Sequence, residues 1–317
     1  MLKILNNLLS IQNSIDKKHK VITILGIKFK FKNKFNVPIN VPYEKLRMVE
    51  IEIFSYCNRR CWFCPNSVID RHSKNILMDE NLYLKILNDL REINYSKMIS
   101  YSRYNEPLSH IDIFEKRLKQ AREYLPNALL HTNTNGDYLS REVLDRLYNA
   151  GLRSMNIQCY LNQNEKFNCE DIKLRNNKMA EKLKLEYKVI CNYTDRYEVK
   201  FDYKDMNLNM YARDFHINGT NRAGILKSIK NNSREVPCYI PFTDLYIDYN
   251  GAVVPCCNFR SDIQEHQKFV YGNANNESIL KIFNNRKIRN LRTILKHKKI
   301  KDLYPCNECN FATDYKY

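Results

Sequence analysis

Three cysteines stand close together in Ser55–Asn66, "SYCNRRCWFCPN", with the spacing C-x3-C-x2-C. Cys57, Cys61 and Cys64 offer one thiolate fewer than a structural zinc ion takes and one more than a disulfide needs. Soft thiolates suit iron–sulfur clusters, and a four-iron cluster held by three cysteines keeps one iron open for another ligand. The spacing therefore predicts an iron–sulfur site at which a small molecule completes the coordination.

Four further cysteines lie in the last third of the chain, and two of them form a C-x2-C pair. Taken alone, Cys238, Cys256, Cys306 and Cys309 suit either a zinc ribbon or a closed iron–sulfur cluster. Cys257 directly follows Cys256, and neighbouring side chains on a strand point to opposite faces, so only one of the two enters a shared site. Eleven cysteines in a chain without a secretion signal favour metal binding over disulfides.

The composition sets the broad class. The 317 residues are 44% hydrophobic, which is enough for a substantial core in one or two domains. The chain has no run of eighteen apolar residues and no small-residue cleavage site near its start, so we expect a cytoplasmic protein. The net charge of +17 comes mostly from scattered lysines without the arginine and aromatic array of a nucleic-acid surface. We expect no nucleic-acid partner, and the charge suits a phosphorylated small molecule.

The middle of the chain alternates strand and helix patterns. Strands are predicted at 47–54, 97–102, 127–134, 152–160 and 187–193, and helices at 79–93, 111–125, 140–151 and 170–186. Asp79 opens the first helix, Ser140 is the N-cap of the third, and Gly151 ends it. This repetition predicts a parallel sheet, open or curved into a full or partial barrel.

The two ends of the chain do not follow this alternation of strands and helices. Residues 1–20 have an apolar-periodic opening that predicts a short amphipathic helix, and 21–34 predict a hairpin that turns at Gly26. Near the other end, Asn250–Gly251 predicts a second hairpin. We expect three parts: an N-terminal extension at 1–45, an α/β core at 46–230 and a C-terminal cysteine domain at 231–317.

The cysteine loop, placed after a first strand and carrying Phe63 directly before Cys64, resembles the radical S-adenosylmethionine (radical SAM) superfamily. The resemblance implies a [4Fe–4S] cluster on Cys57, Cys61 and Cys64, whose open iron is chelated by SAM. An electron from this cluster would cleave SAM to a 5′-deoxyadenosyl radical. The implied fold is α/β, a partial (β/α)6 TIM-like barrel with a small C-terminal α+β domain.

Other segments agree with the resemblance. The second strand ends in "YSRYNEPL", where the superfamily usually has Gly-Gly-Glu-Pro near the SAM amino group; Glu106 and Pro107 match, and Tyr104 and Asn105 replace glycines. Asparagine tolerates the left-handed backbone that glycine adopts, so the turn can persist. "HTNTNG" and "NIQCY" at the next strand ends resemble segments that lie beside SAM. The implied SAM contacts are Phe63, Tyr104, Asn105, Glu106, Asn133, Asn135 and Gln158.

The C-terminal cysteines resemble the auxiliary-cluster domain called SPASM, or its shorter Twitch form. The pattern C-x12-G-x4-C followed by C-x2-C selects Cys256 over Cys257. It implies one auxiliary [4Fe–4S] cluster on Cys238, Cys256, Cys306 and Cys309, and thus two [4Fe–4S] clusters in all. A closed auxiliary cluster carries electrons, which suggests a net oxidation.

The resemblance implies hydrogen abstraction from a small polar substrate such as a sugar, cyclitol or nucleotide sugar, phosphorylated or not. An external flavodoxin- or ferredoxin-like electron donor is expected. Arg213 and Arg222 are candidates for binding the substrate or SAM, and no catalytic base is singled out. Three alternatives stay open: a peptide or protein maturase, a sugar epimerase or dehydratase, and, outside the superfamily, a zinc-ribbon RNA-binding protein. The 45 residues before the core are too few for the peptide-recognition domain usual in peptide-modifying members.

Overall fold

The computed structural model describes the strand backbone at 9–13, 19–24 and 27–32, and then residues 40–229, 234, 236–296, 300–309 and 311. The chain divides into two compact units, residues 1–41 and 42–316. All eleven cysteines belong to the second unit.

The N-terminal unit is a three-stranded antiparallel sheet of β1 (Leu9–Asn13), β2 (His19–Ile24) and β3 (Ile27–Lys32). The predicted hairpin is present as β2 paired with β3, and its turn at Gly26 lies outside the described residues. The predicted helix is wrong at 9–13, which pair with β2 as a strand. Apolar and polar residue types alternate there with period two, which favours a strand. The rest of that predicted helix, at 1–8 and 14–18, also lies outside the description.

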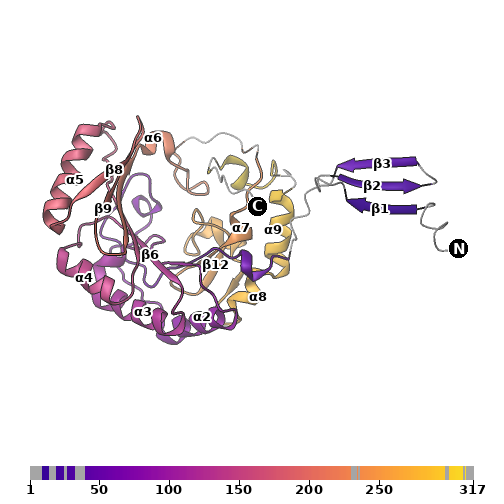
Figure 1. Ribbon diagram of the computed structural model, residues 1–317, viewed down its shortest axis with the longest axis horizontal. Coiled ribbons are helices and arrows are strands. Elements are labelled where there is room, and N and C mark those ends of the chain that lie inside the picture. The colour runs from indigo at the N-terminus through magenta and orange to yellow at the C-terminus, as the bar shows by residue number, and fades with distance from the viewer. Residues whose placement is uncertain are drawn as a thin grey trace. The chain divides into compact units, whose positions relative to one another are not determined.

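The second unit is built on one ten-stranded sheet in the order β13–β12–β11–β4–β5–β6–β7–β10–β9–β8. Six adjacent strands run parallel. They are β11 (Asp244–Ile247), β4 (Met48–Ile51), β5 (Met98–Ser100), β6 (Leu129–Thr134), β7 (Ser154–Gln158) and β10 (Asn207–Arg213). Helices lie along the outer side of the curved sheet (Figure 1): α2 (Glu80–Glu92), α3 (Ile111–Tyr124), α4 (Arg141–Asn149) and α5 (Cys169–Leu183). The fold is the predicted partial α/β barrel.

Local sequence signals set the ends of these helices. The Asp79 carboxylate accepts a hydrogen bond from the Leu82 N–H and caps α2, and the Ser140 hydroxyl accepts one from the Val143 N–H and caps α4. Gly151 follows α4 with φ +107°, a conformation that glycine adopts without a Cβ penalty. These three predictions are confirmed.

The strand predicted at 187–193 is present, but it does not continue the parallel series. It is β8 (Tyr187–Asn192), which pairs antiparallel with β9 (Arg196–Phe201), and β9 pairs antiparallel with β10. The links between these strands are only a few residues long, and a parallel pairing needs a crossover of a dozen residues or more. The parallel neighbour of β7 is therefore β10, and β8 is the edge strand.

The C-terminal segment completes the same sheet. The predicted hairpin turns at Asn250–Gly251 between β11 and β12 (Ala252–Val254), and β13 (Gly272–Asn273) adds one more strand. Because β11 pairs in parallel with β4, the C-terminal segment joins the sheet beside the strand that precedes Cys57.

Shorter helices complete this unit. They are α6 (Phe215–Asn218), α7 (Ile240–Thr243), α8 (Ile279–Phe283), α9 (Arg286–Lys296) and the 3-10 turns η1 (Tyr43–Lys45), η2 (Pro65–Ser67), η3 (Pro107–His110), η4 (Gln264–Phe269) and η5 (Cys306–Glu308). Within the described part of the chain, no helix has the length and apolar character needed to cross a membrane.

The core lies between the sheet and the outer helices. Val49, Ile99 and Leu130 on neighbouring strands are fully buried, as are Ile86 on α2 and Leu118 on α3. Burying such side chains stabilises the folded state by about 1.5–3 kcal/mol each. This packing fixes the strands, and with them the loops that follow their carboxyl ends.

Candidate active site

Cys57, Cys61 and Cys64 follow β4 and line one pocket of about 110 Å³. The loop is closed by backbone hydrogen bonds, from the Cys57 N–H to the Arg71 carbonyl (3.3 Å) and from the Cys64 N–H to the Cys61 carbonyl (2.9 Å). In parallel α/β folds the loops at the carboxyl ends of strands carry the chemistry, and this pocket lies at that edge.

Cys57 and Cys61 are disfavoured as free thiolates in this pocket, and a cationic cluster would stabilise them in that form. Burial raises the pKa of Cys57 and of Cys61 to about 12, and repulsion from Cys64 adds to both shifts. A bound metal reverses this, because its charge deprotonates a coordinating thiol. Among the described residues, no three histidine, cysteine or acidic side chains converge on one point that could hold a single metal ion. The ligands of a cluster bind different irons and need not converge in that way.

Glu106 is buried at the edge of this pocket and already accepts three hydrogen bonds. Its carboxylate receives them from the Leu108 N–H (3.1 Å), the Thr134 hydroxyl (2.7 Å) and the Asn135 N–H (2.8 Å). Burial raises the pKa of Glu106, and these hydrogen bonds oppose the rise. Since a carboxylate has about four acceptor positions, roughly one remains for a ligand. Glu106 therefore joins the ends of β5 and β6 and still faces the pocket.

The two asparagines predicted at the end of β6 line the pocket, and the predicted glutamine lies behind one of them. Asn135 donates from Nδ2 to Asn58 Oδ1 (2.8 Å). Asn133 donates from Nδ2 to the Ser102 hydroxyl (2.7 Å), and its Oδ1 accepts from Gln158 Nε2 (3.3 Å). Gln158 is not among the residues that line the pocket, so it orients Asn133 there.

Tyr104 and Asn105, which replace glycines of the superfamily motif, both line the pocket without a left-handed backbone. The Tyr104 N–H donates to the Glu52 carboxylate (3.2 Å), and its carbonyl accepts from Asn66 Nδ2 (2.9 Å). The turn thus persists through side-chain hydrogen bonds, and the tolerance of asparagine for positive φ is not needed.

The structure separates the two candidate arginines. Arg222 lines the cysteine pocket, as does Phe63, and Arg222 donates from Nε to the Phe63 carbonyl (3.4 Å). Arg213 instead lines a different cavity of about 300 Å³ and lies over the ring of Phe215.

Several lining residues were not predicted from the sequence: Arg59, Asn66, Ser102, Arg103, Thr134 and Tyr160. All six lie within two positions of a predicted residue, and Arg103 and Thr134 directly neighbour one, which is a signal that sequence reasoning can use. Arg59, which lies within the cysteine loop itself, forms an ion pair with Asp137.

The four C-terminal cysteines meet in a second, apolar cavity of about 30 Å³, lined by Cys238, Cys256, Cys306 and Cys309. Burial raises the pKa of Cys306 to about 12, and it also raises the pKa of Cys238 and of Cys256. Cys257 is not among the lining residues. The set of four thiols therefore suits a closed cluster, and Cys256 rather than Cys257 lines the cavity with the other three.

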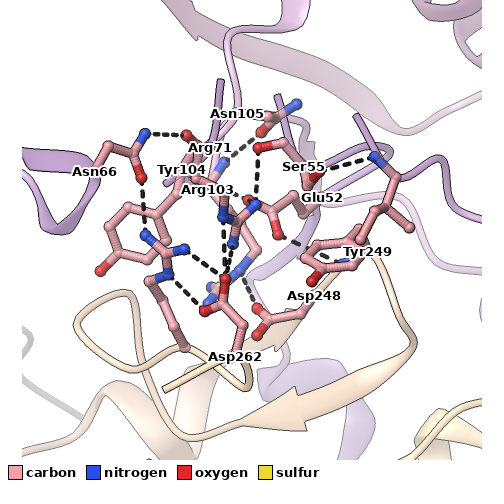
Figure 2. Close-up of polar contacts among 12 residues, drawn as sticks. Glu52, Ser55, Asn66, Arg71, Arg103, Tyr104, Asn105, Asp248, Tyr249 and Asp262 are labelled. Atoms are coloured by element: carbon pink, nitrogen blue, oxygen red, sulfur yellow. Dashed lines mark hydrogen bonds and ion pairs between the residues drawn. The ribbon is translucent and has the colours of Figure 1, made fainter. Parts of the chain in front are cut away.

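A buried network of charges joins the barrel to the C-terminal segment (Figure 2). Arg103, which lines the first pocket, pairs with Asp248 (2.7 Å) from the end of β11. Arg71 pairs with Glu52 (3.2 Å) and with Asp262 (3.0 Å), which lies beyond the C-terminal cysteine pair Cys256–Cys257. The side chains of Arg71 and Arg103 are at most 3% exposed. Removing one partner of such a buried pair typically costs about 3–5 kcal/mol, so the network fixes the C-terminal segment against the barrel.

Comparisons with known proteins agree with this geometry. Residues 51–159 match the family model for the radical SAM superfamily, and residues 238–310 match that for SPASM, an iron–sulfur cluster-binding domain. The S-adenosyl-L-methionine-dependent 2-deoxy-scyllo-inosamine dehydrogenase of Niallia circulans is 30% identical over 268 residues, which cover 83% of this chain and 92% of that protein.

Two solved structures share the fold. The crystal structure of BtrN in complex with AdoMet and 2-DOIA has a TM-score of 0.63 and 26% identity, covering 86% of this chain and 97% of that one. The crystal structure of SeMet BtrN in an open conformation has a TM-score of 0.56 and 24% identity, covering 84% and 92%.

A partial α/β barrel with a cysteine pocket at its carboxyl edge and a second cysteine site beside it defines an iron–sulfur oxidoreductase that depends on SAM. The chain belongs to the radical SAM superfamily and carries a SPASM region at its C-terminal end.

Proposed function

We propose that this protein is a radical SAM dehydrogenase that oxidises a secondary alcohol of a small cyclitol-like molecule to a ketone. The observation that carries the proposal is the pocket that brings Cys57, Cys61 and Cys64 together with Glu106 and Arg222. The likeness to the 2-deoxy-scyllo-inosamine dehydrogenase over 92% of that protein supports the reaction class.

The proposal assigns two [4Fe–4S] clusters. Cys57, Cys61 and Cys64 hold the first, at which SAM is cleaved to supply a 5′-deoxyadenosyl radical. The four C-terminal cysteines hold the second, which supplies an acceptor for an electron: Cys238, Cys256, Cys306 and Cys309. An external flavodoxin- or ferredoxin-like protein donates the electron that SAM cleavage consumes. We propose three parts: an N-terminal extension at 1–45, to which we assign no role, the radical SAM core at 46–230 and the auxiliary-cluster domain at 231–317.

The chain's own groups bind and orient the small molecules. Asn133, Asn135 and the remaining acceptor position of Glu106 offer polar contacts to the amino, carboxylate and ribose groups of SAM. Tyr104, Asn105 and Phe63 line the same pocket and complete the proposed SAM contacts, with Gln158 acting through Asn133. Arg222 is the cation that faces the substrate, and Arg213 lies elsewhere.

The reaction balances without a further co-reactant beyond the electron donor. The substrate carbon gives one hydrogen atom to the 5′-deoxyadenosyl group, the hydroxyl gives up one proton, and one electron leaves. The products are a ketone, 5′-deoxyadenosine and methionine. The electron that leaves equals the electron that SAM cleavage takes up, so the turnover is redox-neutral apart from the exchange of SAM for its products.

Anaerobic reconstitution tests the proposal directly. We expect about eight irons per chain, and dithionite with SAM should yield 5′-deoxyadenosine. With 2-deoxy-scyllo-inosamine, free inositols and inositol phosphates offered in parallel, one of these should yield a ketone in equal amount to 5′-deoxyadenosine. Cys57→Ala should keep about four irons and lose SAM cleavage. Cys191→Ser, on the edge strand β8, is the matched control and should keep both clusters. Zinc in place of iron, or 5′-deoxyadenosine with no ketone from any of the three classes, would contradict it.

A further inference from the structure

Asn258 joins the two cysteine sites through its side chain. It follows Cys256 by two residues and is 3% exposed. Its Nδ2 lies 3.7 Å from Cys309 Sγ, in hydrogen-bonding geometry for sulfur. Its Oδ1 accepts from the Thr220 hydroxyl (3.1 Å) and from Arg222 Nη1 (3.4 Å). Because a guanidinium can only donate, the atom that faces Arg222 is the acceptor Oδ1, which leaves Nδ2 facing Cys309.

The contact with Arg222 extends this link into the first pocket. Arg222 lines the pocket of Cys57, Cys61 and Cys64, and its Nε donates to the carbonyl of Phe63 (3.4 Å). Phe63 directly precedes Cys64. A continuous line of hydrogen bonds therefore runs from the backbone beside one cysteine site to a sulfur of the other.

The backbone at Arg222 is held in an uncommon conformation. Arg222 has φ +50° and Ala223 has φ +55°, both in the left-handed region that non-glycine residues seldom adopt. The Ala223 carbonyl contacts His266 Nε2 (3.0 Å), and the Gly224 N–H donates to Asn221 Oδ1 (3.1 Å), which together keep the turn in place. Strain of this kind persists where the surroundings enforce it, often at functional sites.

Cys309 receives a second hydrogen bond, from a cation. Arg234 Nη2 lies 3.7 Å from Cys309 Sγ. Hydrogen bonds to ligand sulfurs and nearby positive charge both stabilise the more negative, reduced form of a cluster and raise its reduction potential. The hydrogen bond from Arg222 to Asn258 Oδ1 also polarises the Asn258 amide, and this strengthens the amide N–H of Asn258 as a donor to the sulfur.

We propose that Asn258 is a positioning residue that raises the reduction potential of the auxiliary cluster and couples that potential to Arg222 in the SAM pocket. This inference rests on the proposed function, in which Cys309 is a cluster ligand. A raised reduction potential makes the auxiliary cluster a better electron acceptor. The link through Arg222 makes this potential depend on what binds beside Arg222.

The test is the midpoint potential of the auxiliary cluster. The full-length chain carrying Cys57→Ala, Cys61→Ala and Cys64→Ala holds only that cluster, so a redox titration followed by electron paramagnetic resonance reports it alone. Asn258→Leu keeps the number and branching of the side-chain heavy atoms and removes the donor. We expect its potential to fall by about 59 mV, which is a tenfold change for one electron. Asn258→Asp, which replaces the donor by a carboxylate, should lower the potential further.

Two more variants separate the donor from its surroundings. Thr220→Val removes the other hydrogen bond to Oδ1 and leaves the N–H to sulfur, so its potential should stay close to that of the parent. Arg222 contacts the Asn258 amide but not the sulfur. Arg222→Gln should therefore lower the potential by less than Asn258→Leu does. An unchanged potential in both Asn258 variants, with about four irons retained, overturns the inference and leaves the proposed function standing. Zinc at the C-terminal cysteines of the parent overturns both.

Discussion

Tyr104 donates the hydrogen bond of its phenol to the backbone carbonyl of Cys257 over 2.6 Å. Tyr104 belongs to the loop after β5, and Cys257 follows a cysteine of the auxiliary site. A side chain that stands where the superfamily usually has glycine thus holds the two sites together. Its ring also lies 4.9 Å from the Arg260 guanidinium carbon, within the distance at which cation and ring attract.

Tyr104→Phe should destabilise the protein by about 1 kcal/mol, because the buried Cys257 carbonyl loses its donor while the ring packing stays. This corresponds to a fall of about 2 °C in the midpoint of thermal unfolding. The matched control is Tyr193→Phe, since Tyr193 is 68% exposed. Equal midpoints for the two variants would show that the hydrogen bond contributes nothing measurable.

Glu106→Gln should weaken SAM binding by about tenfold and leave both clusters in place. The amide of glutamine turns one acceptor into a donor, which then faces the Thr134 hydroxyl or the Asn135 N–H. The loss of one such hydrogen bond corresponds to about 1.4 kcal/mol. Equilibrium dialysis with SAM under anaerobic conditions measures it, with the exposed Glu92→Gln as control. Unchanged SAM affinity would remove Glu106 from the binding site.

Cys256→Ala and Cys257→Ala should differ sharply in iron content although the residues are neighbours. Cys256 lines the cavity with the other three cysteines, and Cys257 does not. We expect Cys256→Ala to lose about four irons per chain and Cys257→Ala to keep them all, as measured by iron and sulfide analysis. The reverse result would move the ligand to Cys257.

Arg222→Gln should raise the KM for the substrate about tenfold, whereas Arg213→Gln should leave it unchanged. Of these two arginines, only Arg222 lines the pocket of the three cysteines. A cation that contacts hydroxyl or phosphate oxygens contributes about 1.5–3 kcal/mol through charge-assisted hydrogen bonds. Steady-state kinetics with whichever of the three candidate classes yields a ketone checks this, and a larger effect from Arg213→Gln would relocate the substrate site.

Glu50 should make the folded state less stable as the pH rises from about 4.5 to about 7. Burial raises its pKa to about 7, with Arg103 and the Ser100 hydroxyl opposing the rise, from a value of 4.5 in the unfolded chain. In this window the folded state binds more protons than the unfolded state, so this group's contribution to stability decreases with pH. Glu50→Gln removes the effect. Relative to the parent, the variant should therefore gain stability between pH values of about 4.5 and 7.

The measurement compares the thermal midpoints of both proteins at several pH values across this window. The exposed Glu123→Gln controls for the loss of one charge. A difference between parent and Glu50→Gln that stays constant with pH would contradict the predicted titration.

The sequence by itself determined which side chains are available for metal chemistry and the alternation of strands and helices in the core. The spacing sufficed to predict that Cys57, Cys61 and Cys64 share one pocket, because three thiols in one short loop are brought together by the loop itself. The caps at Asp79 and Ser140 could be predicted for the same reason, since a cap involves only residues within one turn of a helix.

Tertiary structure decided which distant residues meet. Arg103 and Asp248 are separated by 145 positions and pair because β11 inserts beside β4. The separation of Arg213 from Arg222 likewise followed from the path of the chain after β10.

The pairing of two strands, β1 and β8, could not be predicted from the sequence. The helix predicted over Leu9–Asn13 became a strand, and Tyr187–Asn192 became an antiparallel edge rather than the next parallel strand. A short segment carries its own periodicity but not the identity of its neighbours. Sheet order depends on hydrogen bonds between segments, so only the assembled sheet decided where Arg222 and Asn258 stand between the two cysteine sites.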